Sequence, residues 1–152
     1  MQNKLSFKNI QRKHLAENQT PRTSVDFLID GKSLFEMLGR EMDLVGVFSP
    51  SWVNNEDTAK IFKMQKLSAL KDHRVLIFCC PECGDITCGG ITAKIQKKDQ
   101  DFEWSDFAYE NNIDDQLTDR KKYLSVGPFT FAPDEYMKTI DLASTCKEDQ
   151  TR

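Results

Sequence analysis

The residues best suited to chemistry are cysteines gathered in one short segment. Residues 79–90 read CCPECGDITCGG and hold four of the chain's five cysteines. Cys80 and Cys83 have the two-residue gap at which a turn directs two thiolates toward one zinc ion, with Cys88 as a third ligand. Structural zinc takes four ligands, and no second pair follows at the usual distance. Cys79, Cys146 or His73 would complete the set only if the fold brings it close.

Two other interpretations of this segment stay open. A redox pair normally precedes a helix, whose dipole lowers the thiol pKa, but Gly89 and Gly90 lead here into a predicted strand. The structural interpretation, a tight connection with small buried cysteines and permissive glycines, is favoured. A catalytic Cys–His pair is disfavoured because the chain has only His14 and His73. We therefore assign no catalytic residue, metal ligand or cofactor and expect no enzyme.

Charge is distributed unevenly along the chain. Residues 101–120 carry seven carboxylates against Arg120, whereas residues 1–22 carry five Lys and Arg against Glu17. An acidic segment repels nucleic acid and attracts basic protein surfaces. The alternative is that these carboxylates form an ordinary solvated face.

An aromatic strand runs directly into this acidic segment. Strand alternation buries Phe102 and Trp104, and a kink would turn Phe107 inward as well. A tyrosine with carboxylates at the end of a strand suits recognition of a basic protein. The alternative interpretation is that Tyr109 completes the core and the carboxylates are solvated. The predicted partner-binding residues are Glu103, Asp106, Tyr109, Glu110, Asp114 and Asp115.

The totals indicate one domain of a cytoplasmic protein. The chain has 152 residues, of which 39% are apolar, and a net charge of −3. It has no run of about 20 apolar residues for a membrane span, and residues 1–4 lack the apolar start of a secretory signal. The five cysteines are odd in number and four of them are clustered, whereas secreted disulfide scaffolds space their cysteines along the chain.

The elements that must position these residues are mostly strands. Period-two or continuous apolar patterns predict strands at 24–29, 44–48, 75–78, 91–96, 102–105 and 126–131. Helices are predicted at 34–38, from 57 to about 70, and from Pro133, whose missing amide suits a first helical position. The sequence thus predicts an α+β fold with an antiparallel meander of about five strands and two or three helices mainly on one face. Residues 1–22 are expected to form a flexible polar arm, 23–145 the domain and 146–152 a frayed tail.

Three pieces of the chain resemble a widespread family of small bacterial proteins. They are residues 76–90, the strand 104–107 with its extension 109–111, and residues 127–131 followed by Tyr136 and Met137. No catalytic residues of that family are carried over. Small acidic proteins of this kind are similar to immunity proteins of contact-dependent growth inhibition. The resemblance implies an immunity or antitoxin-like protein that binds and blocks a cognate toxin domain, a nuclease, through its acidic surface. The alternative is a zinc-binding module or metalloenzyme using Cys80, Cys83 and Cys88.

Overall fold

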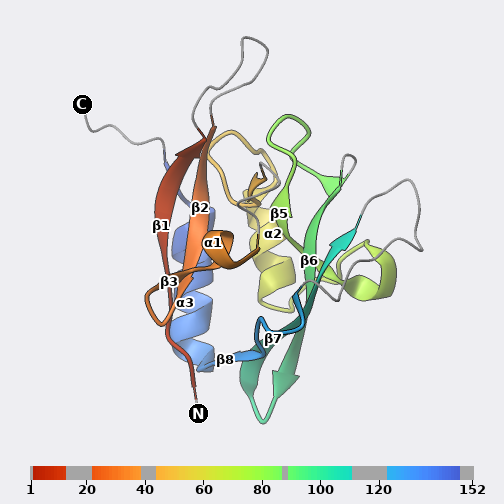
Figure 1. Ribbon diagram of the computed structural model, residues 1–152. Coiled ribbons are helices and arrows are strands. Elements are labelled where there is room, and N and C mark those ends of the chain that lie inside the picture. Colours follow the sequence, from red (N-terminus) through yellow and green to blue (C-terminus); the bar gives the residue numbers. More distant parts are fainter. Residues whose placement is uncertain (1, 13–21, 39–43, 87–88, 111–122, 148–152) are drawn as a thin grey trace.

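The computed structural model describes residues 2–12, 22–38, 44–86, 89–110 and 123–147, which contain eight strands and three α-helices (Figure 1). The strands are β1 (Leu5–Arg12), β2 (Arg22–Ile29), β3 (Lys32–Ser33), β4 (Val45–Gly46), β5 (Val75–Cys79), β6 (Gly90–Lys98), β7 (Asp101–Glu110) and β8 (Phe129–Phe131). The helices are α1 (Leu34–Leu38), α2 (Asn55–Phe62) and α3 (Pro133–Ser144), with a short 3₁₀ helix at Lys71–His73.

The strands form two antiparallel sheets, in the orders β1-β2-β3 and β4-β5-β6-β7-β8. The sheets meet where the Val25 amide donates to the Phe48 carbonyl at 2.9 Å. They meet again where the Asn3 amide donates to the Thr130 carbonyl at 2.6 Å. The α+β class and the antiparallel pairing predicted from the sequence are therefore confirmed, but the expected single meander is divided between two sheets.

The helices lie on both sides of β2, with two of them on one side. Phe27 stacks on Phe62 of α2, with ring centroids 5.9 Å apart. The neighbouring Asp26 accepts hydrogen bonds from the Phe35 amide at 3.0 Å and the Ser33 hydroxyl at 2.5 Å. Since adjacent strand residues point to opposite faces, α1 and α2 lie on opposite sides of β2. Helix α3 lies beside α2, where Lys63 pairs with Asp141 at 2.5 Å (Figure 1).

The core is centred on Trp104 of β7, which is fully buried. Its indole Nε1–H donates to the Tyr136 hydroxyl at 3.0 Å, and that hydroxyl donates to the Phe62 carbonyl at 2.7 Å. Burial raises the pKa of Tyr136 far above its usual range. The rings of Phe27 and Phe131 contact the indole edge to face at 5.3 and 5.1 Å. This chain of contacts joins β7, α2 and α3.

The N-terminal prediction was wrong for part of its length. Residues 5–12, expected within a flexible arm, form β1 and pair with β2 from Leu5 opposite Ile29 to Arg12 opposite Arg22. The signal was weak because only Leu5 of this strand is buried, so the apolar period is nearly absent. Residues 13–21 and 148–152, predicted as arm and tail, lie outside the described residues.

Helix α2 ends earlier than the sequence predicted, at Phe62 instead of near residue 70. Met64 has a left-handed φ of 61°, and its amide donates to the Ile61 carbonyl at 3.0 Å. The Gln65 amide donates to the Lys60 carbonyl at 2.8 Å. These two bonds form a Schellman motif, with methionine in the position that glycine usually occupies. The motif turns the chain, so the residues after Met64 leave the helical face on which their spacing had placed them.

Candidate functional site

The predicted site residues on β7 are arranged by a bulge at Asp106. The pairing of β6 with β7 shifts between Thr92 and Lys94, opposite Asp106, which has a left-handed φ of 54°. The extra residue lets Trp104 and Phe107 both be buried, although they are three positions apart. The predicted kink is thus present. Because Trp104 and Phe107 point inward, the neighbouring Glu103 and Asp106 point to the opposite face of the sheet.

Arg74, which no sequence motif marks as a site residue, binds two of the predicted site residues. Its side chain is 2% exposed. Nη1 lies 2.9 Å from Asp106 Oδ2, and Nε lies 3.2 Å from Glu110 Oε2. Nε also donates to Thr92 Oγ1 at 2.8 Å, and Nη2 donates to the carbonyls of Thr92 and Asp106. We call Arg74, Thr92, Asp106 and Glu110 the arginine cluster.

The arginine cluster changes the electrostatics expected of this face. One guanidinium faces two carboxylates, so a buried cation offsets half of the negative charge that the sequence placed there. The Thr92 hydroxyl also donates to Glu110 Oε2, which fixes that carboxylate from a second side. Asp106 and Glu110 are therefore held in defined positions instead of moving freely in solvent.

The other predicted site residues lie in different surroundings. Glu103 is 7% exposed, accepts a hydrogen bond from the side-chain Nε2 of Gln96 at 2.8 Å and lies 3.8 Å from the ammonium of Lys98. Tyr109 is half-buried and packs against the core, where Gly89 leaves room for its hydroxyl. A Cβ on Gly89 would lie 2.1 Å from that oxygen. Asp114 and Asp115 lie outside the described residues.

A hollow of about 230 Å³ brings two of the predicted residues together. Glu103, Ser105 and Asp106 form its wall on β7, and Leu124, Val126 and Pro128 are among the residues on the facing segment. Leu124 is 76% exposed, so the hollow presents apolar surface beside carboxylates. We call it the acidic hollow.

The cysteine segment contains a buried thiol and a loop fixed by arginines. Burial, with a smaller contribution from Cys80, raises the pKa of Cys79 to about 12. The Arg22 Nε–H donates to the Pro81 carbonyl at 2.7 Å, and Arg12 pairs with Glu82 at 2.8 Å. Within the described ranges, no three His, Cys, Asp or Glu side chains are grouped to hold a metal ion. Cys88, the third ligand in the zinc hypothesis, lies outside those ranges.

Comparison with protein-family models, with curated proteins and with solved structures found no match. None of the helices in the described part of the chain combines the length and apolar character needed to span a membrane. Functional inference for this chain therefore depends on the geometry of its own residues.

Proposed function

We propose that this chain binds a partner protein by accepting a basic segment of that partner in the acidic hollow. The observation that carries the proposal is the meeting of Glu103 and Asp106 with the exposed side chain of Leu124 around one hollow. A lysine or arginine side chain has the complementary structure, because an apolar stem carries its cationic head. The stem would contact Leu124 while the head approaches the carboxylates.

The arginine cluster supports this proposal through preorganisation. Arg74 already holds one oxygen of Asp106 at 2.9 Å, so that carboxylate needs little further ordering when a partner binds. Exposed ion pairs contribute only up to about 1 kcal/mol each, so charge alone would not hold a complex. The apolar contact at Leu124 supplies the burial that charge pairs lack, and the carboxylates supply orientation and a faster encounter.

The resemblance to immunity proteins gives a narrower form of the proposal. In that form the partner is a cognate toxin domain with nuclease activity, and binding blocks it. A nuclease surface is basic because it contacts a phosphate backbone, so it would offer lysine and arginine side chains to the hollow. Residues 111–120, which follow β7 in the sequence, add three carboxylates to the charge that favours such a partner. In the described part of the chain, no group of side chains favours the zinc-binding alternative.

Photo-crosslinking tests the proposal at the hollow itself. A photoreactive phenylalanine analogue would replace Leu124 in cells that naturally contain this chain, with the same analogue at Val53 as the control. Val53 is fully exposed and outside the lining of the hollow. We expect one discrete adduct from position 124 and none from position 53, with a basic partner segment at the attachment point. Equal adducts from the two positions would contradict the proposal.

Neutral variants then test the carboxylates. Glu103→Gln and Asp106→Asn keep the side-chain shapes, and asparagine tolerates the left-handed backbone at position 106. We expect the double variant to lose the adduct and to stop inhibiting the purified partner, while remaining folded by circular dichroism. Charge reversal at Asp106 or Glu110 is a poorer test, because a new lysine would face the buried Arg74 and destabilise the fold.

A further inference from the structure

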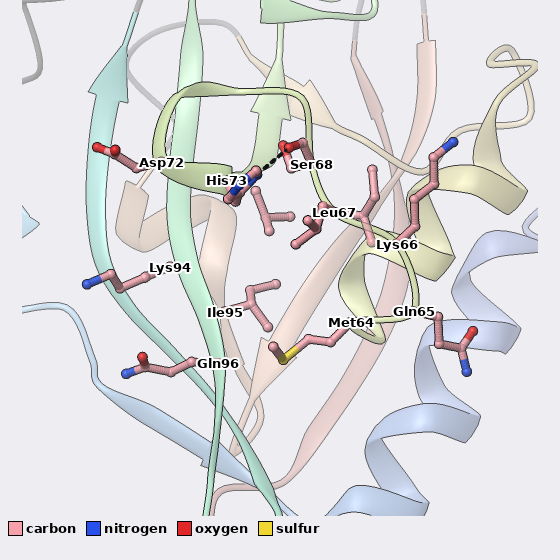
Figure 2. Close-up of a pocket in the computed structure, with 12 residues that line it drawn as sticks. Met64, Gln65, Lys66, Leu67, Ser68, Asp72, His73, Lys94, Ile95 and Gln96 are labelled. Atoms are coloured by element: carbon pink, nitrogen blue, oxygen red, sulfur yellow. Dashed lines mark hydrogen bonds between the residues drawn. The ribbon is translucent and has the colours of Figure 1, made fainter.

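A second hollow, unrelated to the predicted acidic surface, lies between β6 and the loop that follows α2 (Figure 2). Its volume is about 320 Å³. Figure 2 shows the side chains of Met64, Leu67 and Ile95 pointing toward one another across this space. Lys66 and Lys94, which also border it, point away. We call this hollow the apolar pocket.

The apolar walls are exposed although they face one another. Met64 is 45% and Leu67 is 72% exposed. The Schellman motif at the end of α2 removes both residues from the helical face that packs on the core. An exposed leucine forgoes most of the roughly 2 kcal/mol that burial of its side chain provides. Contact with a bound molecule would recover part of that free energy.

His73 is one of the residues that line the pocket. Its Nδ1 lies 2.9 Å from the Ser68 carbonyl oxygen. A carbonyl only accepts, so Nδ1 carries the hydrogen, and Nε2 of the neutral ring is left with a lone pair. The backbone at Asp72 and His73 is left-handed, with φ of 57° and 55°.

We propose that the apolar pocket binds a neutral bicyclic aromatic molecule that carries one hydrogen-bond donor. Size points to two fused rings, because an apolar cavity of about 150 Å³ holds one benzene and this pocket has about twice that volume. Neutrality follows from the outward direction of Lys66, Lys94 and Asp72, the charged residues that line the pocket. The donor follows from Nε2 of His73, which would accept an N–H or O–H of the ligand.

Indole and 1-methylindole are matched probes for this proposal, since they differ only in the N–H group. Each would be titrated into the ¹⁵N-labelled full chain at pH 8, above the range in which histidine side chains usually titrate. We expect saturable amide shifts at residues 64–68, 73 and 95. Indole should bind about fivefold more tightly, the effect of one net hydrogen bond. Absence of saturation at millimolar probe, or shifts centred on the acidic hollow, would overturn the proposal.

Variants at exposed positions keep the test independent of folding. Leu67→Asp places a charge in the pocket wall, and Leu142→Asp makes the same change on α3 at a residue that is 53% exposed and outside the lining. We expect Leu67→Asp to weaken indole binding about tenfold and Leu142→Asp to leave it unchanged. In His73→Asn, indole and 1-methylindole should bind equally. Equal weakening by the two aspartates, or a retained preference for indole in His73→Asn, would overturn the proposal.

Discussion

The acidic hollow and the apolar pocket border neighbouring strands, but the fold fixes their walls in different ways. The hollow uses Glu103, Ser105 and Asp106 of β7, whereas the pocket uses residues 94–96 of β6 and the loop after α2. In the hollow, side-chain hydrogen bonds from Arg74 and Gln96 hold the carboxylates. In the pocket, left-handed backbone angles direct the walls. The two proposed sites therefore differ in what holds their walls: paired charges, added to the bulge at Asp106, hold those of the hollow, and backbone geometry directs those of the pocket.

The largest effect is expected from removing the cation that supports the acidic hollow. Arg74→Met leaves Asp106 and Glu110 without their buried partner, which for buried pairs costs about 3–5 kcal/mol. We expect a loss near the lower end, about 3 kcal/mol, because solvent screens the Asp106 side chain, which is 34% exposed. Urea unfolding measures this change in the free energy of unfolding.

Two further variants make the arginine result specific. Adding Asp106→Asn and Glu110→Gln to Arg74→Met should restore part of the lost stability, because no unpaired charge then remains. Lys66→Met removes a half-exposed partner of Asp57 and should change stability by less than about 0.5 kcal/mol. If Arg74→Met were as mild as Lys66→Met, the cluster would not be holding the carboxylates.

The next largest effect is expected at the hydroxyl that links the two regions. Tyr136→Phe leaves the buried Trp104 N–H and Phe62 carbonyl without their shared partner. We expect a loss of about 2 kcal/mol in the free energy of unfolding. Trp104 lies on the strand of the hollow, and Phe62 ends the helix that leads to the pocket. Hydrogen exchange should therefore speed up at residues 64–68 and at residues 104–106 alike, and faster exchange in only one segment would show that the regions open independently.

The strands of the central sheet were predictable because their apolar residues follow simple periods. Residues 75–78 are a continuous apolar run, and they belong to β5, which lies between β4 and β6. Pro133 begins α3, as the fixed φ of its ring favours. The edge strand β1 was missed because it buries Leu5 alone. The early end of α2 was missed because its Schellman motif uses methionine, and a pattern that looks for glycine overlooks it.

The candidate site was predictable residue by residue but not as an arrangement. Carboxylates at Asp106 and Glu110 were visible in the sequence, and so was the kink that turns Phe107 inward. Their partner Arg74 comes 32 positions before Asp106, and a single arginine preceding an apolar run carries no local signal of ion pairing. The apolar pocket was hidden because the helix predicted from 57 to about 70 would have carried Met64 and Leu67 on one helical face with Ile61.

Two carboxylates outside the arginine cluster, Asp26 and Asp30, have pKa values shifted in opposite directions. Burial raises the pKa of Asp26, although hydrogen bonds from Ser33 and the Phe35 amide oppose the rise. Hydrogen bonds from the Lys4 amide and from Asn3 lower the pKa of Asp30. The folded state thus binds a proton at Asp26 more readily than the unfolded chain does, and at Asp30 less readily.

These opposite shifts give opposite pH dependences. The contribution of Asp26 to stability is largest below its unfolded pKa of 3.8 and falls as pH rises through the folded value. The contribution of Asp30 to stability is present above pH 3.8 and is lost as pH falls through the lowered pKa that Asp30 has in the folded state. For each of Asp26→Asn and Asp30→Asn, the free energy of unfolding would be measured and subtracted from that of the unmodified chain between pH 2.5 and 6. These two differences, plotted against pH, should have slopes of opposite sign. Parallel slopes would contradict this assignment.

The smallest effect is expected at the turn that forms the apolar pocket, and there stability should improve. Met64→Gly removes a left-handed methionine, which costs about 1–2 kcal/mol, but adds the unfolded-state entropy of glycine. We expect a net gain of about 0.5 kcal/mol. Gln65→Gly is the matched control, because Gln65 has no left-handed backbone and glycine there should destabilise the fold.

Indole binding should weaken in Met64→Gly, since one wall of the apolar pocket is lost, even though the fold gains stability. The side chain of Met64, as a wall of the pocket, would explain why methionine stands where glycine would be more stable. Unchanged indole binding in Met64→Gly would contradict that explanation.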